Sequence, residues 1–198
     1  MSLGDIDQML EVEKLAWPNP KQQFSKSNFI SQLKIFPEGC FGIYINERLV
    51  GMLNGLKISK NELSKKNYTW YSLSDNGNFQ THDKKGEIFF IASLSVDPSC
   101  RGAGLGKLLL EQAKRYVILN GLDAIILGSR MPCYKKFKNR YTPAQYLNKY
   151  KKHLLDDWLL RFYEKAGFKP QSIISNYFYD PESGNNGVLM VWDNKKRK

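Results

Sequence analysis

The segment over residues 88–119 constrains the fold of this chain more than any other. Residues 88–96 are nearly all apolar, which is typical of a central strand covered on both faces. Three glycines follow within five residues, and the apolar spacing of 105–119 then predicts an amphipathic helix that ends at Asn120-Gly121. A strand, a glycine-rich turn and a helix N-terminus in this order form an anion-binding cradle, because backbone N–H groups and the helix dipole favour the same negative charge.

Two common phosphate cradles fit this turn poorly. The P-loop requires Gly, four residues and then Gly-Lys-Ser/Thr, but here Leu108 follows Gly106-Lys107 and Arg101 stands at the position of the first glycine. The dinucleotide fingerprint Gly-x-Gly-x-x-Gly requires a third glycine where this chain has Lys107. Nucleotide hydrolysis and NAD binding are therefore both disfavoured.

A third cradle matches at every fixed position. Arg101, Gly104 and Gly106 fit Arg/Gln-x-x-Gly-x-Gly/Ala, and Val96 and Pro98 supply the Val-x-Pro that precedes it. This turn resembles the acyl-CoA-binding motif of the GNAT acyltransferase superfamily. Residues 162–168, with the sequence Phe-Tyr-Glu-Lys-Ala-Gly-Phe, are similar to a second segment that lies late in that fold.

The resemblance implies an α+β protein with the GNAT fold. That fold has a central mixed, mostly antiparallel sheet whose strands 4 and 5 splay apart, flanked by about four helices. The residue pattern predicts helices over 5–16, 27–35, 105–119 and 154–166, and strands over 40–45, 49–56, 88–96, 124–128, 173–179 and 187–192. No strand is evident before the first helix, which indicates a truncated N-terminus or a shortened sheet. We expect a single GNAT domain over 1–198, with a disordered basic tail at 194–198.

The resemblance also implies the activity and the cofactor site. It implies an acyl-CoA-dependent N-acyltransferase, with acetyl-CoA or a related acyl-CoA as co-substrate and an unidentified amine as acceptor that attacks the thioester directly. The pantetheine arm would lie between the splayed strands, and backbone N–H groups would bind the carbonyl oxygen and the pyrophosphate. The residues that it assigns to the cofactor are Leu94, Ser95, Val96, Arg101, Gly102, Ala103, Gly104, Leu105, Gly106 and Lys107.

The catalytic candidates are less well defined than the cofactor residues. The resemblance makes Tyr163 a general acid for the departing thiolate, although a half-buried helix tyrosine is an equal interpretation. For the general base, His82 precedes the central strand and titrates in the required range, while Glu87 opens that strand; we prefer His82. Trp17 and Trp70 are candidates either for the walls of an acceptor pocket or for core aromatic residues.

A narrower resemblance covers more of the chain. It concerns a subset of GNAT domains, some of which are fused to nitrilase-like amidohydrolases, while similar domains load acyl groups in polyketide assembly. That subset implies other thioester chemistry, either decarboxylation or acyl transfer to a carrier protein. A non-catalytic acyl-CoA-binding module is a separate alternative from a different functional class. The residues that carry the narrower resemblance are Trp70, Gly77, His82, Gly86, the run 130–134, Thr142-Pro143, Tyr146 and the run 179–184.

The positive charge is concentrated in two segments. The chain carries 30 Lys and Arg residues against 19 Asp and Glu, a formal charge of +11. Residues 130–152 hold eight of these cations and 194–198 hold four, without any acid, so the remainder is nearly neutral. Phosphorylated CoA is the polyanion for which the chain has a motif, whereas nucleic-acid binding would rest on charge alone and is not expected. The segment 130–152 is open to three interpretations: an RNA-binding loop, a lid over a phosphorylated ligand, or a surface that attracts an acidic acceptor.

The remaining composition predicts a cytoplasmic enzyme without metal. Cys40, Cys100 and Cys133 are widely spaced and only His82 and His153 could join them, so a structural zinc site is not expected. Unpaired thiols fit a reducing compartment. No apolar run approaches the roughly 20 residues of a membrane span, and no signal peptide opens the sequence. A homodimer is left open.

Overall fold

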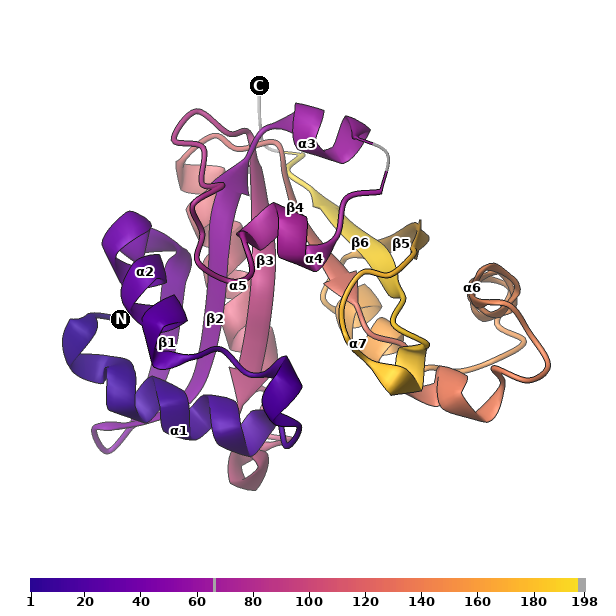
Figure 1. Ribbon diagram of the computed structural model, residues 1–198, viewed down its shortest axis with the longest axis horizontal. Helices are drawn as coiled ribbons and strands as arrows, with labels where there is room; N and C mark the ends of the chain where they lie inside the picture. Colours follow the sequence, from indigo (N-terminus) through magenta and orange to yellow (C-terminus); the bar gives the residue numbers. More distant parts are fainter. Residues whose placement is uncertain (66, 196–198) are drawn as a thin grey trace.

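A mixed sheet organises the protein (Figure 1). The computed structural model describes residues 1–65 and 67–195, and in this part of the chain the sheet has six strands in the order β1-β2-β3-β4-β6-β5. Only the pairing of β3 with β4 is parallel. The strands are β1 Cys40–Ile45, β2 Arg48–Ile58, β3 Ile88–Val96, β4 Ala124–Ser129, β5 Lys169–Ile174 and β6 Gly187–Asp193.

The sheet opens in its middle, between β3 and β4. Within the described residues their ladder pairs only Ile88–Phe90 with Ala124–Ile126, yet β3 continues to Val96 and β4 to Ser129. The two strands therefore diverge, as Figure 1 shows. A β-bulge at Ala92 disturbs the pairing of β3 with β2 at the start of the divergence, because Gly55 pairs with Ile91 and Asn54 with Ser93. The splayed pair that the GNAT resemblance predicts is confirmed.

Helices cover both faces of the sheet. Helices α1 and α2 pack on one face of β1–β3, and α5 packs on the opposite face. Two separate cores result: Met9 and Val12 of α1 lie with Met52, and Leu109 and Val117 of α5 lie in the larger cluster. The α-helices are α1 Ile6–Ala16, α2 Lys26–Ile35, α3 Lys60–Ser64, α4 Trp70–Ser74, α5 Leu105–Leu119, α6 Pro143–Lys151 and α7 Trp158–Lys165. The 3-10 turns are η1 Leu3–Asp5, η2 Pro20–Gln22, η3 Pro37–Gly39, η4 Pro98–Cys100, η5 Pro132–Lys136 and η6 Pro181–Ser183.

The structure corrects two predicted elements in the C-terminal third. The helix predicted over 154–166 is shorter, because the carboxylate of Asp157 accepts from the N–H groups of Leu159 and Leu160 and starts α7 at Trp158. The strand predicted over 173–179 is wrong: β5 ends at Ile174, and Asn176 has a left-handed φ of 50° that turns the chain away from the sheet. Residues 177–186 then cross over the opening of the sheet.

The two ends of the chain compare differently with the expected pattern. In the described part of the chain α1 and α2 precede every strand, as expected from the sequence. In the tail predicted to be disordered, Asn194 is buried and its side-chain amide donates to the Leu122 carbonyl at 2.8 Å. Residues 196–198 lie outside the described residues. None of the described helices combines the length and apolar character needed to cross a bilayer.

Candidate active site

The glycine-rich turn connects the end of β3 with α5. Gly102 and Gly104 have φ angles of 86° and 78°, a region that favours glycine, and a Cβ on either would meet nothing within 4 Å. Gly104 is the N-cap of α5 and provides no side-chain hydrogen bond to it. The first N–H groups of α5 therefore meet an open surface, and Arg101 and Lys107 are exposed beside them. This arrangement suits an anion such as a pyrophosphate.

The two sequence motifs meet at Gly106. A Cβ there would lie 3.1 Å from Cζ of Phe162 on α7 and 3.7 Å from Cδ2 of Leu94 on β3. Glycine thus lets α7, β3 and the first turn of α5 approach closely. Tyr163 follows Phe162 and is buried, with its ring centroid 5.9 Å from that of Phe168.

A pocket of about 60 Å³ lies on the α1 face, where β3 and β4 diverge. Both strands contribute to its walls, together with α1, α4 and the crossing segment 177–186. A larger hollow of about 340 Å³ lies near Ile118 and Trp192, at the other end of α5 from the glycine turn. The residues that line the smaller pocket are Glu13, Trp17, Gln22, Phe24, Trp70, Ala92, Ser93, Gly128, Arg130, Tyr177, Phe178, Asp180 and Asn186.

Two aromatic side chains hold the facing strand edges at this pocket. The indole of Trp70 donates to the Ala92 carbonyl at 2.8 Å, and the hydroxyl of Tyr177 accepts from Gly128 N–H at 3.2 Å. The Tyr177 ring lies against Gly128, where a Cβ would be 2.1 Å from the ring. These side chains therefore form hydrogen bonds with backbone groups that would pair with the neighbouring strand in a continuous sheet. As to the two interpretations of these tryptophans, Trp17 and Trp70 both line the pocket, and Trp70 also packs against both hydrophobic cores.

A buried carboxyl on α1 is the feature that the sequence analysis missed. Glu13 is 1% exposed; it accepts from Phe24 N–H at 3.0 Å and from the Ser95 hydroxyl at 2.9 Å. Burial, partly offset by these hydrogen bonds, raises the pKa of Glu13 to about 7. Its sequence signal is an acid on the buried stripe of an amphipathic helix, next to Val12 and four residues after Met9.

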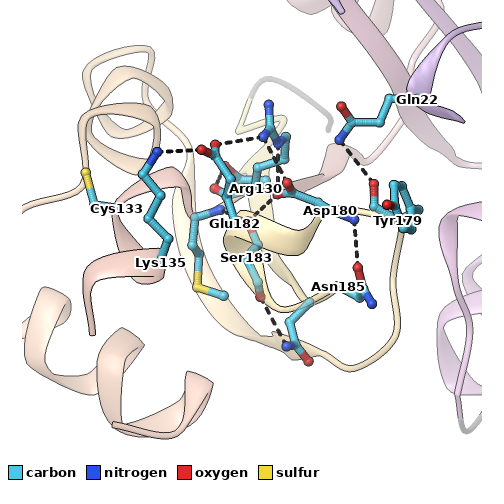
Figure 2. Close-up of polar contacts among 12 residues, drawn as sticks. Gln22, Arg130, Cys133, Lys135, Tyr179, Asp180, Glu182, Ser183 and Asn185 are labelled. Carbon is cyan, nitrogen blue, oxygen red and sulfur yellow. Dashed lines mark hydrogen bonds and ion pairs between the residues drawn. The ribbon is translucent and has the colours of Figure 1, made fainter. Parts of the chain in front are cut away.

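An ion-pair cluster forms the opposite wall (Figure 2). Arg130, just after β4, makes two bonds to Asp180, at 2.8 and 2.9 Å, and a third to Glu182 at 3.2 Å. Burial tends to raise the pKa of Asp180, but the hydrogen bonds from Arg130 and Ser183 lower it overall. Ser183 also accepts from Met131 N–H at 2.7 Å, so the cluster fixes the segment 177–186 to the end of β4.

This crossing segment joins the two halves of the sheet. From the N-terminal half, the Gln22 side chain donates to the Tyr179 carbonyl at 3.1 Å, and Trp70 N–H donates to the Tyr177 carbonyl at 2.9 Å. The Arg130 guanidinium also lies 5.4 Å from the ring centre of Trp17, at the end of α1. The pocket is therefore closed by contacts between residues that are far apart in sequence.

Tyr163 lies close to this wall. Its hydroxyl has no hydrogen-bond partner among the described residues, and it interacts electrostatically with Arg130 and Tyr177. Burial raises the pKa of Tyr163, and the positive charge of Arg130 offsets only part of that effect. The phenol is therefore protonated at neutral pH.

The two residues predicted as general base lie elsewhere. The His82 ring stacks on Phe36 at 4.2 Å and its Nδ1 accepts from Lys57 N–H at 3.2 Å, while Glu87 accepts from Lys60 N–H at 3.3 Å. Glu87 precedes β3, and Ser95 comes eight residues later, roughly 26 Å at ~3.3 Å per strand residue. The structure therefore brings neither residue to the pocket; they lie near the other end of the central strand.

The basic segment 130–152 begins at the pocket wall with Arg130 and ends at α6, which lies at the edge of the molecule farthest from α1 (Figure 1). Its rings at Tyr134, Tyr146 and Tyr150 are buried, so they serve packing rather than a stacking surface for bases. Lys135 pairs with Glu182 at 2.6 Å. The three cysteines are free thiols. Within residues 1–65 and 67–195 no three His, Cys, Asp or Glu side chains are grouped so that they could hold a metal ion.

Solved structures with a similar fold include three that differ in function. The loading GNATL domain of CurA from Lyngbya majuscula has a TM-score of 0.85 and 22% identity, covering 98% of this chain and 94% of that one. The GphF GNAT-like decarboxylase in complex with isobutyryl-CoA has a TM-score of 0.84 and 22% identity, covering 98% and 96%. The ribosomal-protein-S18-alanine N-acetyltransferase of Escherichia coli has a TM-score of 0.59 and 15% identity, covering 98% and 90%. These likenesses show the fold.

Two proteins of Bacillus subtilis (strain 168) are similar in sequence. The uncharacterized N-acetyltransferase YkwB is 31% identical over 193 residues, which is 96% of this chain and 85% of that protein. The probable hydrolase YhcX is 28% identical over 191 residues, but this chain spans 37% of its length. The family model for the acetyltransferase (GNAT) family matches residues 6–137, which include the glycine-rich turn, the splayed strands and Glu13. This chain is therefore a member of the GNAT acetyltransferase family.

Proposed function

We propose that this protein is an acyl-CoA-dependent N-acyltransferase that transfers an acyl group, acetyl first among the candidates, to an amine by direct attack on the thioester. The observation that carries the proposal is the divergence of β3 and β4 between two sites on opposite faces of the sheet. The glycine-rich turn lies on the α5 side and the pocket on the α1 side. Two substrates held on the two sides can react through the opening without a covalent enzyme intermediate.

The donor site consists mainly of backbone. The N–H groups from Arg101 to Gly106 and the N-terminus of α5 would bind the pyrophosphate, with Arg101 and Lys107 adding positive charge. The edge of β3 beyond Phe90 is unpaired with β4 among the described residues. Those backbone N–H groups of the stretch from Leu94 to Val96 that face this opening would stabilise negative charge that develops on the carbonyl oxygen.

Replacing Gly104 with alanine is expected to weaken CoA binding about tenfold, because a Cβ at a φ of 78° costs roughly 1–2 kcal/mol and deforms the cradle. Gly121 is a matched control: it also has a positive φ, 64°, and open space for a Cβ, but it lies at the other end of α5. Calorimetric titration should show weaker binding for Gly104→Ala alone, while both variants lose similar thermal stability. Equal affinity for the two variants would place the CoA site elsewhere.

Tyr163→Phe is expected to lower kcat by about a hundredfold with CoA affinity unchanged, since a positioned acid typically contributes at least that factor. The buried phenol would protonate the departing thiolate. Tyr116→Phe is the control, because this ring on α5 packs on Phe36 and Phe89. Thiol release from acetyl-CoA measures both rates, and an unchanged kcat removes Tyr163 from the mechanism.

The proposal as a whole is tested by calorimetry with CoA and acetyl-CoA, followed by thiol release with a panel of amines. We expect binding of both ligands and amine-dependent release. No CoA binding would overturn the proposal, and binding without turnover would indicate an acyl-CoA-binding module.

A second candidate is thioester decarboxylation or acyl transfer to a carrier protein. It is favoured because the loading domain and the decarboxylase match this fold more closely than the S18-alanine N-acetyltransferase does. Conversion of malonyl-CoA to acetyl-CoA without any amine would support this candidate over N-acyl transfer. The narrower resemblance to GNAT domains fused to amidohydrolases likewise stays a proposal, supported by the partial match to YhcX.

A further inference from the structure

Two serines of β3 connect the pocket with the buried carboxyl of Glu13. Ser93 lines the pocket, and its Oγ lies 3.4 Å from Oγ of Ser95. Residues two apart on a strand share one face, so both hydroxyls point toward α1. Ser95 Oγ in turn lies 2.9 Å from Oε2 of Glu13. A continuous path of hydroxyl groups therefore leads from the pocket to the carboxyl.

The direction of these hydrogen bonds follows from the ionised carboxylate of Glu13, which can only accept, together with the indole of Trp17. The indole Nε1 of Trp17 can only donate, and it does so to Ser95 Oγ at 2.9 Å. Ser95 has one proton and gives it to Glu13, which leaves one acceptor position on its oxygen for the Ser93 hydroxyl. Every hydroxyl thus donates toward Glu13, which is the order that proton movement from the pocket to Glu13 requires.

Glu13 has no ion-pair partner among the described residues. The charged side chains that share its pocket are Arg130 and Asp180, and they bind each other together with Glu182. On α1 the neighbouring charged residues, Glu11 and Lys14, are exposed. The segment just before α2 contributes only the neutral backbone N–H of Phe24, which donates to Glu13. A buried carboxylate without a counter-ion gains by taking up a proton.

We propose that Glu13 is the base of the acyl transfer and that Ser93 and Ser95 carry the proton to it; this inference rests on the proposed function. As the N–C bond forms and the C–S bond breaks, the amine proton moves to Ser93 Oγ, the Ser93 proton to Ser95 Oγ, and the Ser95 proton to Glu13 Oε2. Tyr163 protonates the thiolate. One proton leaves the amine and one reaches the sulfur, and after each turnover Glu13 releases its proton while the Tyr163 phenolate takes one up, so atoms and charges balance without any redox partner.

The first test compares pH profiles of kcat/KM for acetyl transfer in the wild type and Glu13→Gln. The wild type should lose activity as the pH falls through about 7, where Glu13 becomes protonated. Glu13→Gln should lose about a hundredfold in rate and this pH limb, while it still binds CoA. Glu11→Gln, an exposed residue on the same helix, should keep both. A Glu13→Gln variant that keeps the wild-type limb would overturn the proposal.

The second test addresses the serines. Ser93→Ala and Ser95→Ala should each lower kcat at least tenfold with CoA affinity unchanged, and Ser93→Thr, which keeps the hydroxyl, should restore the rate. Full activity of both alanine variants beside an inactive Glu13→Gln would overturn the relay, because the carboxyl would then take the proton directly. A wild type that transfers acetyl to no amine overturns the proposed function and the relay together, whereas an active wild type with an active Glu13→Gln overturns the relay alone.

Discussion

Replacing Arg130 with alanine is expected to lower the free energy of unfolding by up to about 3 kcal/mol at pH 7, the low end of the cost of removing one partner of a buried ion pair, because the Arg130 side chain is itself 27% exposed. The Asp180 side chain is 2% exposed and would keep its charge without the two hydrogen bonds from Arg130. Lys135→Ala is the control: Lys135 and Glu182 are 53% and 39% exposed, so its loss should cost at most about 1 kcal/mol. Urea denaturation of the two variants measures the difference.

The same substitution has a characteristic pH dependence. Because the folded-state pKa of Asp180 is lowered, the pair contributes stability above the unfolded pKa of about 4, and this contribution is lost as the pH falls through the lower folded-state value. The difference between wild type and Arg130→Ala should therefore shrink at acid pH. Adding Asp180→Asn to Arg130→Ala should recover part of the loss at pH 7. A difference that is constant with pH would contradict an ionic origin.

The parts of the fold that could be predicted from the sequence are those that contiguous residues specify. The apolar run of β3, the glycines after it and the periodic face of α5 each specify a local structure, and their boundaries agree with the sequence analysis. Helix α6 has a local signal too, a capping box in which Thr142 and Gln145 bond each other's backbone, although no helix was predicted there. The apolar residues after Ile174 resemble a strand in their residue pattern, but the turn at Asn176 directs the chain across the opening of the sheet.

The candidate site divides in the same way. The glycine-rich turn could be predicted from the sequence because one short segment supplies both its shape and its N–H groups. The pocket could not be predicted, since Glu13, Ser93, Arg130 and Asp180 come from four distant segments. These segments meet only when the crossing segment 177–186 is in place. His82 and Glu87 are near the central strand in sequence, but sequence proximity does not say which end of the strand is the active one. The acid on the buried stripe of α1 was the available signal for Glu13.

Glu13→Gln is expected to raise the free energy of unfolding at pH 8 by up to about 3 kcal/mol and to leave it nearly unchanged at pH 4. Burial raises the folded-state pKa of Glu13 from 4.5 to about 7, so between these values the folded state binds the proton more tightly than the unfolded state. Stability of the wild type therefore falls as the pH rises through this range, by about 1.4 kcal/mol for each unit of difference. The neutral amide has no such penalty.

Denaturation of wild type, Glu13→Gln and Glu11→Gln at pH 4 and pH 8 measures this effect. The exposed Glu11 should show no comparable gain at pH 8, since its ion pair with Arg48 lies at the surface. Equal stability of wild type and Glu13→Gln at pH 8 would mean that the carboxyl is solvated rather than buried in the folded chain. If Glu13→Gln is more stable at pH 8 yet slower in acyl transfer, Glu13 serves the chemistry at the expense of folding stability. A packing role would not explain an acid whose removal stabilises the core.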